Sequence, residues 1–394
     1  MITRFRVQNY KALRDVQLDL TPLHVLVGPN DSGKSSILEA IAALCRSVEV
    51  PLTEAFAGDW EGRQLVRFEA SEPDVHLEVG GVLDDATEFS YLLGCRFAIQ
   101  ARNCSTWGES VQVGAEPARQ VGTHGPGDSV VRQVAHTGQS TNQFAERLAR
   151  AVYGVVRGVQ VCRWNPRTLA LPCAPDASRQ FRIDASGFGL ALCIDNILGA
   201  DRSRFDRLEA RFKRVFPNVT RIQLLPREAF RTPSEIAGGV PLLQKSDGKG
   251  LYFQIENSPA SFAASQVSDG MLLILAYLTI LNLPNPPRMI LVEEPENGVH
   301  PSRLREVITI LRELVEESKQ TQVVMTTHSP YLVDLFKPEE VTLCLREDDG
   351  SVSTHRLSDS PTVSEQLKHF KLGEIWTGEG DDSLAREIAA SAGK

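Results

Sequence analysis

Residues 23–40, LHVLVGPNDSGKSSILEA, combine three features that together predict one local structure. The first five residues are almost entirely apolar, which is typical of a short strand buried on both faces. Residues 35–48 place apolar side chains three and four positions apart, as on one stripe of a helix. Between the two, residues 28–35 match the pattern G-x-x-x-x-G-K-[ST]. We therefore expect a buried strand, a glycine-rich loop and a helix in direct succession.

This loop has the chemistry of a phosphate-binding site. Glycines let successive backbone N–H groups curl around an anion, and a helix N-terminus favours negative charge. We predict that the nucleotide contacts are Gly28, Asn30, Asp31, Ser32, Gly33, Lys34, Ser35 and Ser36. Lys34 would reach the terminal phosphates, and the Ser35 hydroxyl would be a ligand of Mg²⁺. The alternative is a chance glycine-rich turn, which the strand before it and the helix after it disfavour.

The composition is that of an ordinary soluble globular protein, with 42% hydrophobic and 23% charged residues. The net charge of −8 gives no overall attraction to nucleic acid or to an anionic membrane, although a local basic patch would still allow DNA binding. Seven scattered cysteines without a CxxC pair argue against a disulfide framework and a zinc site, and fit a reducing compartment. No apolar run approaches 18 residues, and the N-terminus has no signal core. We expect a cytoplasmic protein that does not use a membrane.

Both ends of the chain carry strand patterns suited to a parallel sheet. The final third predicts a helix at 272–283, a buried strand at 288–294, a helix at 302–318 and a buried strand at 321–328. Because residues 23–27 supply a similar strand, we expect one core sheet assembled from both ends, with the middle of the chain inserted.

The rest of the chain predicts smaller elements. Residues 2–10 and 13–21 indicate an antiparallel pair of strands. We expect further antiparallel strands at 64–70, 75–83 and 95–101, a loop at 116–140, and helices at 141–155 and 188–216. The predicted fold class is α/β, with a mixed or parallel core sheet, an antiparallel β subdomain and an inserted helical subdomain. The expected segments are 1–115, 116–250, 251–345 and 346–394.

Two adjacent carboxylates end the predicted strand at 288–294. A parallel sheet binds ligands at the carboxyl ends of its strands, so Glu293 and Glu294 would lie at that edge. Successive strand residues point to opposite faces, and the two acids should therefore have different roles. We assign Glu293 to the Mg²⁺ shell through water and Glu294 to polarising the attacking water. The alternative is that one or both are solvated charges at a strand end.

A histidine follows the next predicted strand, in the sequence TTHSP at 326–330. Imidazole can donate a hydrogen bond to a γ-phosphate and so respond to its presence. A lone histidine is more often structural, but the position of His328 beside the acidic strand favours the catalytic role.

The order of these motifs resembles the ABC-type ATPase heads of SMC, RecF and OLD-like proteins. More closely, the chain is similar to bacterial OLD-like AAA ATPases found with anti-phage and toxin-like partners. The supporting strings are residues 5–40, VSDGMLLILA at 267–276, EEPENGVHP at 293–301 and TTHSP, with WNPRTLALP and DASGFGLALCIDNIL matching more weakly in the middle.

The resemblance implies a dimer in which two copies enclose ATP, with Ser268 and Gly270 contacting the γ-phosphate bound by the other copy's loop. Asp269 and Met271 replace the Gly and Gln usual in that signature, and Glu293 stands where many relatives have Asp. Residues 297–300 occupy the loop that runs along the dimer interface in the family. No glutamine is assigned to a Q-loop.

Two further features have competing interpretations. Arg204, Arg207, Arg211 and Arg214 form a row beside the apolar stripe of a predicted helix. A solvated helix face is the simpler reading, and a surface for phosphate backbones or a partner is the alternative.

Residues 378–382, GEGDD, resemble the opening of the TOPRIM nuclease domain of OLD proteins. Here we expect a turn and a terminal helix, without a nuclease active site.

Our leading hypothesis is an ATPase that binds Mg-ATP, dimerises head to head and acts as a switch or sensor for a separate effector, a nuclease or toxin, in bacterial anti-phage defence. In this scheme Glu294, His328 and Lys34 are catalytic, and Ser35 and Glu293 hold the metal. One alternative is a DNA-repair ATPase of the RecF or SMC type that binds DNA. Another is a nucleotide-gated scaffold whose hydrolysis is incidental.

Overall fold

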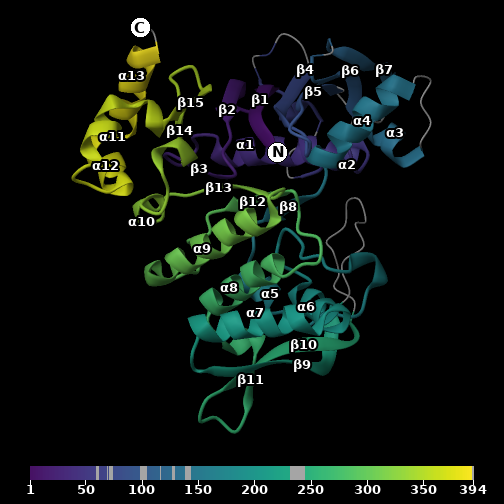
Figure 1. Cartoon of the computed structure of the whole chain (residues 1–394), viewed down its shortest axis with the longest axis vertical. Helices are drawn as coiled ribbons and strands as arrows, with labels where there is room; N and C mark the ends of the chain where they lie inside the picture. Colours follow the sequence, from purple (N-terminus) through teal and green to yellow (C-terminus); the bar gives the residue numbers. More distant parts are fainter. Residues whose placement is uncertain are drawn as a thin grey trace. The chain divides into compact units, whose positions relative to one another are not determined.

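The computed structural model describes residues 1–58, 62–68, 70, 74–97, 104–115, 117–126, 129–137, 143–230 and 245–392 (Figure 1). The chain forms two compact units. The first comprises Met1–Val159, Pro287–Glu293 and Lys319–Lys394, and the second comprises Gln160–Pro286 and Glu294–Ser318. These units cut across the four expected segments, because 116–159 falls in the first unit and 251–345 is shared by both.

The core sheet of the first unit is assembled from both ends of the chain, as predicted. Its strand order is β15-β14-β3-β13-β12-β8. Strand β3 pairs in parallel with both β13 and β14, and β13 pairs in parallel with β12, whereas β15 is antiparallel to β14. The strands are β3 (Leu23–Val27), β8 (Val159–Cys162), β12 (Met289–Glu293), β13 (Gln322–Thr326), β14 (Val341–Arg346) and β15 (Val352–Arg356). Every residue of β3 and β13 is buried, which explains their continuous apolar character.

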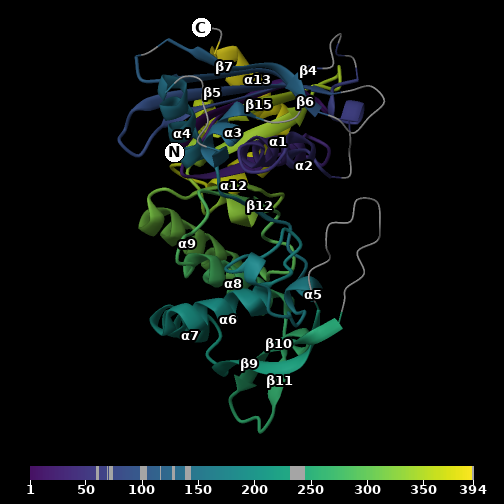
Figure 2. The same cartoon turned by 90° about the vertical axis from the view of Figure 1, so that its right-hand side faces the viewer.

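A second, antiparallel sheet in the same unit has the order β2-β1-β4-β5-β6-β7. Its strands are β1 (Ile2–Tyr10), β2 (Leu13–Asp19), β4 (Asp74–Val82), β5 (Glu88–Phe97), β6 (Cys104–Val113) and β7 (Arg119–Pro126). Helices α3 (Val130–Thr137) and α4 (Gln143–Val156) pack against β7, and Figure 2 shows them beside the sheet. The remaining helices of this region are α1 (Lys34–Ser47) and α2 (Leu52–Ala55). This sheet is the expected antiparallel subdomain.

A buried carboxylate joins this sheet to α3. Glu109 of β6 accepts hydrogen bonds from the backbone N–H groups of Val130 and Val131, and from the hydroxyls of Tyr91 and Ser129. Burial raises the pKa of Glu109, an effect that these four donors oppose. The carboxylate therefore caps the start of α3 and determines where that helix begins.

The strand predicted at 64–70 does not form in the described residues, and the strand predicted at 95–101 has other boundaries. Residues 62–65 form a 3₁₀ turn, and only an isolated bridge joins Val66 to Tyr10, because this segment meets the end of β1 rather than entering a ladder. The second strand begins earlier, at Glu88, and ends at Phe97. Residues 98–101 lie outside the described residues. The strand expected at 75–83 is confirmed as β4.

The loop expected at 116–140 was also wrong for most of its described part. Residues 119–126 form β7, which hydrogen-bonds to β6, and residues 130–137 form α3. The glycines that suggested a loop are tolerated because β7 lies at the edge of the sheet, where only one neighbour is required. Residues 116, 127–128 and 138–140 lie outside the described residues.

The second unit is mainly helical, with a small sheet. Helix α8 is apolar on all sides and almost wholly buried, and it packs against α5, α6, α7 and α9. The helices are α5 (Pro166–Leu169), α6 (Leu190–Ala200), α7 (Arg202–Val215), α8 (Asp269–Leu281) and α9 (Pro301–Ser318). The sheet has the order β11-β10-β9, from β9 (Val219–Phe230), β10 (Lys245–Ile255) and β11 (Ser261–Ala263). No helix in the described ranges is long and apolar enough to cross a bilayer.

The arginine row on α7 is partly engaged within the second unit. Arg204 donates a hydrogen bond of 2.9 Å to the carbonyl of Leu283, and Arg211 forms an ion pair with Glu313 of α9. Arg207 and Arg214 are exposed. Two of the four guanidinium groups therefore hold helices together, which favours the structural interpretation of this row.

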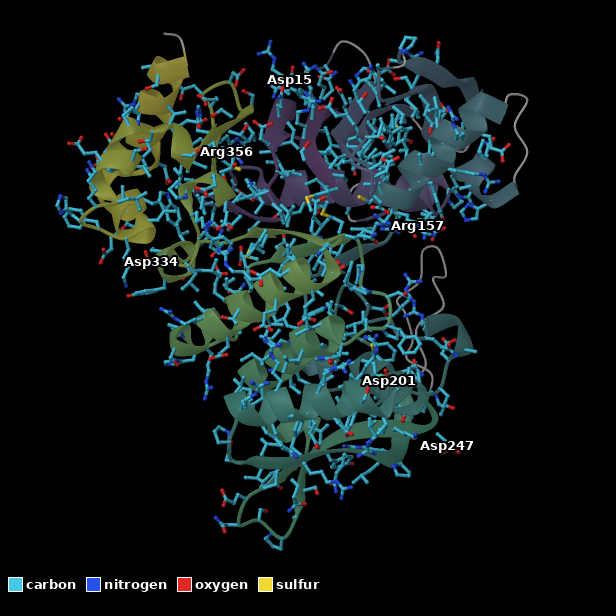
Figure 3. The ribbon with its side chains drawn as sticks, viewed as in Figure 1. Asp15, Arg157, Asp201, Asp247, Asp334 and Arg356 are labelled. Atoms are coloured by element: carbon cyan, nitrogen blue, oxygen red, sulfur yellow. The ribbon has the colours of Figure 1, made fainter. Side chains whose placement is uncertain are left out.

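The C-terminal helices of the first unit are α10 (Pro330–Val333), α11 (Pro361–Gln366), α12 (Leu372–Glu379) and α13 (Asp381–Ala392). Among them, α12 packs against α10, and α13 packs against β14 and β15. The N–H of Gly373 donates a 2.9 Å hydrogen bond to Asp334, the residue labelled near α10 in Figure 3. A Cβ at Gly373 would lie 2.1 Å from the carbonyl oxygen of Pro330, so α12 approaches α10 closely. The turn at Gly380 and the terminal helix after it are confirmed.

Acid should destabilise the first unit through His24 of β3. Its Nε2 lies 2.9 Å from the Thr342 hydroxyl of β14, and burial lowers the pKa of His24 to about 3. An unfolded histidine has a pKa of about 6.5, so between those values only the unfolded chain binds the proton. We expect the free energy of unfolding to fall by up to about 1.4 kcal/mol per pH unit below pH 6.5 from this group. Urea unfolding at pH 7, 6 and 5 measures this slope.

His24→Gln should remove that part of the slope, because the amide cannot titrate but can still hydrogen-bond to Thr342. The matched control is His369→Gln, since His369 is exposed. An unchanged slope in His24→Gln would show that the burial of this imidazole does not contribute to acid sensitivity.

Candidate functional site

The loop between β3 and α1 needs its two glycines for the fold itself. Gly28 and Gly33 have φ values of 136° and 85°, which side chains rarely adopt. A Cβ at Gly28 would lie 2.1 Å from the carbonyl oxygen of Cys344 in β14, and one at Gly33 would lie 2.6 Å from Val352 of β15. The neighbouring strands therefore exclude any side chain at either position.

Lys34 lies at the centre of this loop, at the first position of α1. Its side chain is buried, and its ammonium group donates to the carbonyls of Gly28 and Pro29 at 2.9 and 2.6 Å and to the Ser32 hydroxyl at 3.1 Å. The loop thus curls around the ammonium group. No acidic side chain occupies the first turn of α1, so the favourable field for an anion at this helix start is not neutralised locally.

The other loop residues differ in exposure. Asn30, Asp31 and Ser35 are exposed, Ser36 is half-buried, and Ser32 is buried. Asp31 adopts φ 63°, a left-handed conformation that helps the backbone to turn. Ser35, the predicted metal ligand, is therefore accessible to solvent in the first turn of α1.

The strand register brings the acidic and histidine motifs of the first unit to the same edge of the sheet as this loop. Glu293 is aligned with Thr326, and Thr326 with Leu26, two residues before Gly28. The N–H of Thr327 extends the ladder with a 3.1 Å hydrogen bond to the carbonyl of Leu26, and His328 follows directly. Residues that are about 300 positions apart in the sequence therefore meet at one sheet edge.

Glu294 begins a tight turn in the second unit. Its φ is 47°, a left-handed conformation that is uncommon for a glutamate. Its Oε2 accepts a 2.7 Å hydrogen bond from the side-chain amide of Asn297, and its carbonyl accepts one of 3.0 Å from the Asn297 N–H. The structure therefore places the two acids differently, with Glu293 on a strand and Glu294 in a constrained turn.

Ser268 and Gly270 lie at the start of α8, as expected. Ser268 is the N-cap residue, but its hydroxyl makes no capping hydrogen bond, and Ser268 is exposed. A Cβ at Gly270 would lie 3.4 Å from the Gly298 carbonyl oxygen and 3.9 Å from Val299, which are ordinary contacts. Unlike Gly28 and Gly33, Gly270 is therefore not required by the packing of its own chain.

The residues available for a metal suit Mg²⁺ better than a transition metal. Within the described ranges, no group of three or more His, Cys, Asp and Glu side chains converges on one point. Ser35 and Glu293 offer hydroxyl and carboxylate oxygens, the hard ligands that Mg²⁺ binds together with water and substrate phosphates. A set of only two protein ligands fits a metal ion that is also bound by the phosphates of a nucleotide.

Two family models match parts of the chain. An AAA ATPase domain matches residues 1–76, and a model described as "AAA domain, putative AbiEii toxin, Type IV TA system" matches residues 192–334. These two regions contain residues 28–35, which we call the phosphate loop, and also the start of α8, Glu293, Glu294 and His328. Over these two regions the chain is similar to ABC-type AAA ATPases.

Curated relatives of this chain are distant, but their similarity extends along most of its length. The OLD nuclease of Thermus scotoductus is 22% identical over 389 residues, which cover 95% of this chain and 68% of that protein. An ATP/GTP phosphatase of Helicobacter pylori is 20% identical over 365 residues, which cover 89% of this chain and 94% of the phosphatase.

Solved structures show the same fold. An SMC head bound to the C-winged helix domain of ScpA matches with a TM-score of 0.54 at 14% identity, covering 90% of this chain and 97% of that one. A second SMC head, with an extended coiled coil and derived from Pyrococcus furiosus, matches with a TM-score of 0.51 at 12% identity, covering 93% and 99%. The α/β fold of this chain, with its mixed core sheet, is like that of an SMC head.

The sequence motifs did not reveal one contact of this site, the hydrogen bond from Asn297 to Glu294. The signal was present as Asn-Gly at 297–298, a dipeptide typical of tight turns, three residues after the acid. The turn type alone does not say that the amide of Asn297 would reach back to a carboxylate.

The glycine requirement at position 28 predicts a stability difference. Gly28→Ala should lower the free energy of unfolding by at least about 2 kcal/mol, because it combines a strained φ with a backbone clash. Gly154→Ala is the matched control: Gly154 lies in α4 with open space around it, and alanine should stabilise the helix by about 0.5–1 kcal/mol. Urea unfolding of both variants without nucleotide tests this. Equal stabilities would contradict the close approach of β14 to the loop.

Proposed function

We propose that this protein binds Mg-ATP, hydrolyses it to ADP and phosphate, and closes as a dimer around the nucleotide. The observation that carries the proposal is the strand register, which aligns Glu293 and the segment leading to His328 with the phosphate loop. A parallel sheet binds its ligand at this edge, and the three groups have complementary roles in phosphoryl transfer.

Each residue has a defined role in the proposed reaction. The ammonium group of Lys34 exchanges its loop carbonyls for the terminal phosphates. Ser35, and Glu293 through water, would hold Mg²⁺, which would neutralise negative charge on the phosphates. The imidazole of His328 donates to a γ-phosphate oxygen. Glu294 orients a water molecule and accepts its proton as the water oxygen bonds to the γ-phosphorus. The bond from the γ-phosphorus to the bridging oxygen breaks, and ADP leaves with the electron pair.

The dimer is supported by Gly270. The packing of its own chain accepts a Cβ at this position, yet glycine in the first turn of a helix costs about 1 kcal/mol relative to alanine. A phosphate that approaches the N–H groups at the start of α8 would account for this cost. We infer that the phosphate belongs to the nucleotide of a second copy, with the exposed Ser268 hydroxyl beside it.

This arrangement would work as a switch. The γ-phosphate would contact the loop of one copy and the start of α8 in the other, so its cleavage removes contacts that hold the closed state. We propose that a separate effector protein, a nuclease or a toxin, reads this state in bacterial anti-phage defence in the cytoplasm. Support comes from the OLD nuclease relative and from the toxin-system description of the matching AAA model.

The DNA-repair alternative has less support. It needs a basic surface, but Arg204 and Arg211 already contact groups of their own unit, and the net charge is −8. The scaffold alternative differs from the ATPase proposal in one measurable respect, since it needs nucleotide binding but not turnover.

Glu294→Gln tests the proposal. The amide can hydrogen-bond to water but cannot take its proton, so ATP turnover should fall by about 100-fold or more. Mg-ATP should still bind, and the proportion of dimer should rise because the γ-phosphate is retained. Phosphate release and light scattering measure the two effects. The control is Glu316→Gln, an exposed glutamate on α9 that should leave both unchanged.

Normal turnover in Glu294→Gln would refute the catalytic assignment. If the wild-type protein dimerises with ATP but does not hydrolyse it, the scaffold alternative is correct. Stimulation of turnover by duplex DNA would favour the repair alternative.

A further inference from the structure

A second residue in the turn after β12 is arranged to act on the reaction through Glu294. We propose that Asn297 is a positioning residue that holds the Glu294 carboxylate in the orientation needed for water attack. This inference rests on the proposed role of Glu294 and adds a residue to which no function has been assigned above.

Asn297 holds Glu294 at both ends. Its backbone N–H donates a 3.0 Å hydrogen bond to the Glu294 carbonyl, which closes a four-residue turn with Pro295 at the second position. Its side-chain amide donates a 2.7 Å hydrogen bond to Oε2 of the same glutamate. The first bond fixes the backbone of the acid, and the second fixes the direction of its carboxylate.

The conformation of Glu294 makes this restraint necessary. A non-glycine residue at φ 47° costs about 1–3 kcal/mol and persists only where its surroundings enforce it. A glutamate side chain also loses up to about 2 kcal/mol of rotamer entropy when it is held in one orientation. The two hydrogen bonds from Asn297 offset these costs before substrate arrives, so the carboxylate is preorganised.

The turn that contains Asn297 rests on the start of α8. A Cβ at Gly298 would lie 3.2 Å from Leu273 and 3.4 Å from the Cβ of Asp269, so the backbone of the next residue packs directly on that helix. Leu273 is buried in the core of the second unit. Asn297 therefore projects from a turn that is anchored to a buried helix, which keeps its amide in place.

The simpler interpretation is that Asn297 only stabilises the turn. In that case its loss would lower stability and would affect turnover equally at every pH. A positioning residue instead acts through the carboxylate of Glu294. The effect of a substitution should therefore require that carboxylate and should depend on the charge of the side chain at position 297.

Three variants separate these interpretations. Asn297→Ala should lower kcat for ATP about 10-fold or more, while KM changes less than twofold, because orientation matters in the transition state and not in nucleotide binding. In the Glu294→Gln background, Asn297→Ala should cause no further loss. Asn297→Asp should be most active at low pH, where the introduced carboxyl is protonated and can donate to Glu294. Its kcat relative to that of wild type should fall at least about 10-fold as the pH rises from 5 to 8, because two adjacent carboxylates repel each other.

The matched control is Asn257→Ala. Asn257 also adopts a left-handed conformation, φ 60°, but lies in the turn between β10 and β11. It should lose stability without a change in kcat or in the pH profile. Thermal unfolding of every variant shows that each is folded at the assay temperature.

Two results would overturn the inference while leaving the proposed function intact. In the first, Glu294→Gln loses turnover but Asn297→Ala keeps turnover within twofold of wild type. The other is a pH profile of Asn297→Asp parallel to that of wild type. Normal turnover in Glu294→Gln would instead refute the catalytic role of Glu294, and the positioning role with it.

Discussion

The pairing of β3 with strands from the other end of the chain is the constraint on which the site depends. Strand β3 lies between β13 and β14, and its hydrogen bonds to β13 align Leu26 with Thr326 and, one strand further, with Glu293. A shift of one residue in either ladder would move a whole row of side chains to the other face of the sheet. The register therefore fixes which residues share the edge with the phosphate loop.

The same pairing explains why the loop is rich in glycine. Strand β14 brings the Cys344 carbonyl so close to Gly28 that no Cβ fits, and β15 does the same to Gly33 through Val352. Packing alone requires these two glycines, whereas Gly270 has room for a Cβ within its own chain. Packing within the chain therefore does not account for glycine at position 270, and this is why we propose that a second copy approaches it.

The sequence predicted the core sheet, and the motifs that lie at its edge, because their signals are local and redundant. Residues 23–40 carry an apolar run, a phosphate motif and a helical stripe in succession, and the acids and His328 each end a continuous apolar strand. The antiparallel sheet was predicted less well. Its edge strand β7 contains glycines that indicate a loop, and it forms because β6 offers hydrogen bonds to it. Helix α3 begins where Glu109 caps it, a contact made by a residue 21 positions upstream.

The asparagine that holds Glu294 shows the same limit within the site. The turn was detectable from Asn-Gly, but the hydrogen bond from the Asn297 amide to the carboxylate of Glu294 was not. Motif reasoning identifies which residues carry the chemistry. The hydrogen bonds that orient those residues are visible only in the three-dimensional structure.

The central claim is that each nucleotide site combines the phosphate loop of one copy with Gly270 of another. Mixing two inactive variants, Lys34→Ala and Gly270→Arg, tests it most directly. In a mixed dimer, the intact loop of the Gly270→Arg copy meets the intact α8 start of the Lys34→Ala copy, and one complete site forms. ATP turnover should therefore reappear on mixing and rise with protein concentration. If both variants are inactive alone and the mixture stays inactive at every ratio, the site is not shared between copies, and the account is wrong.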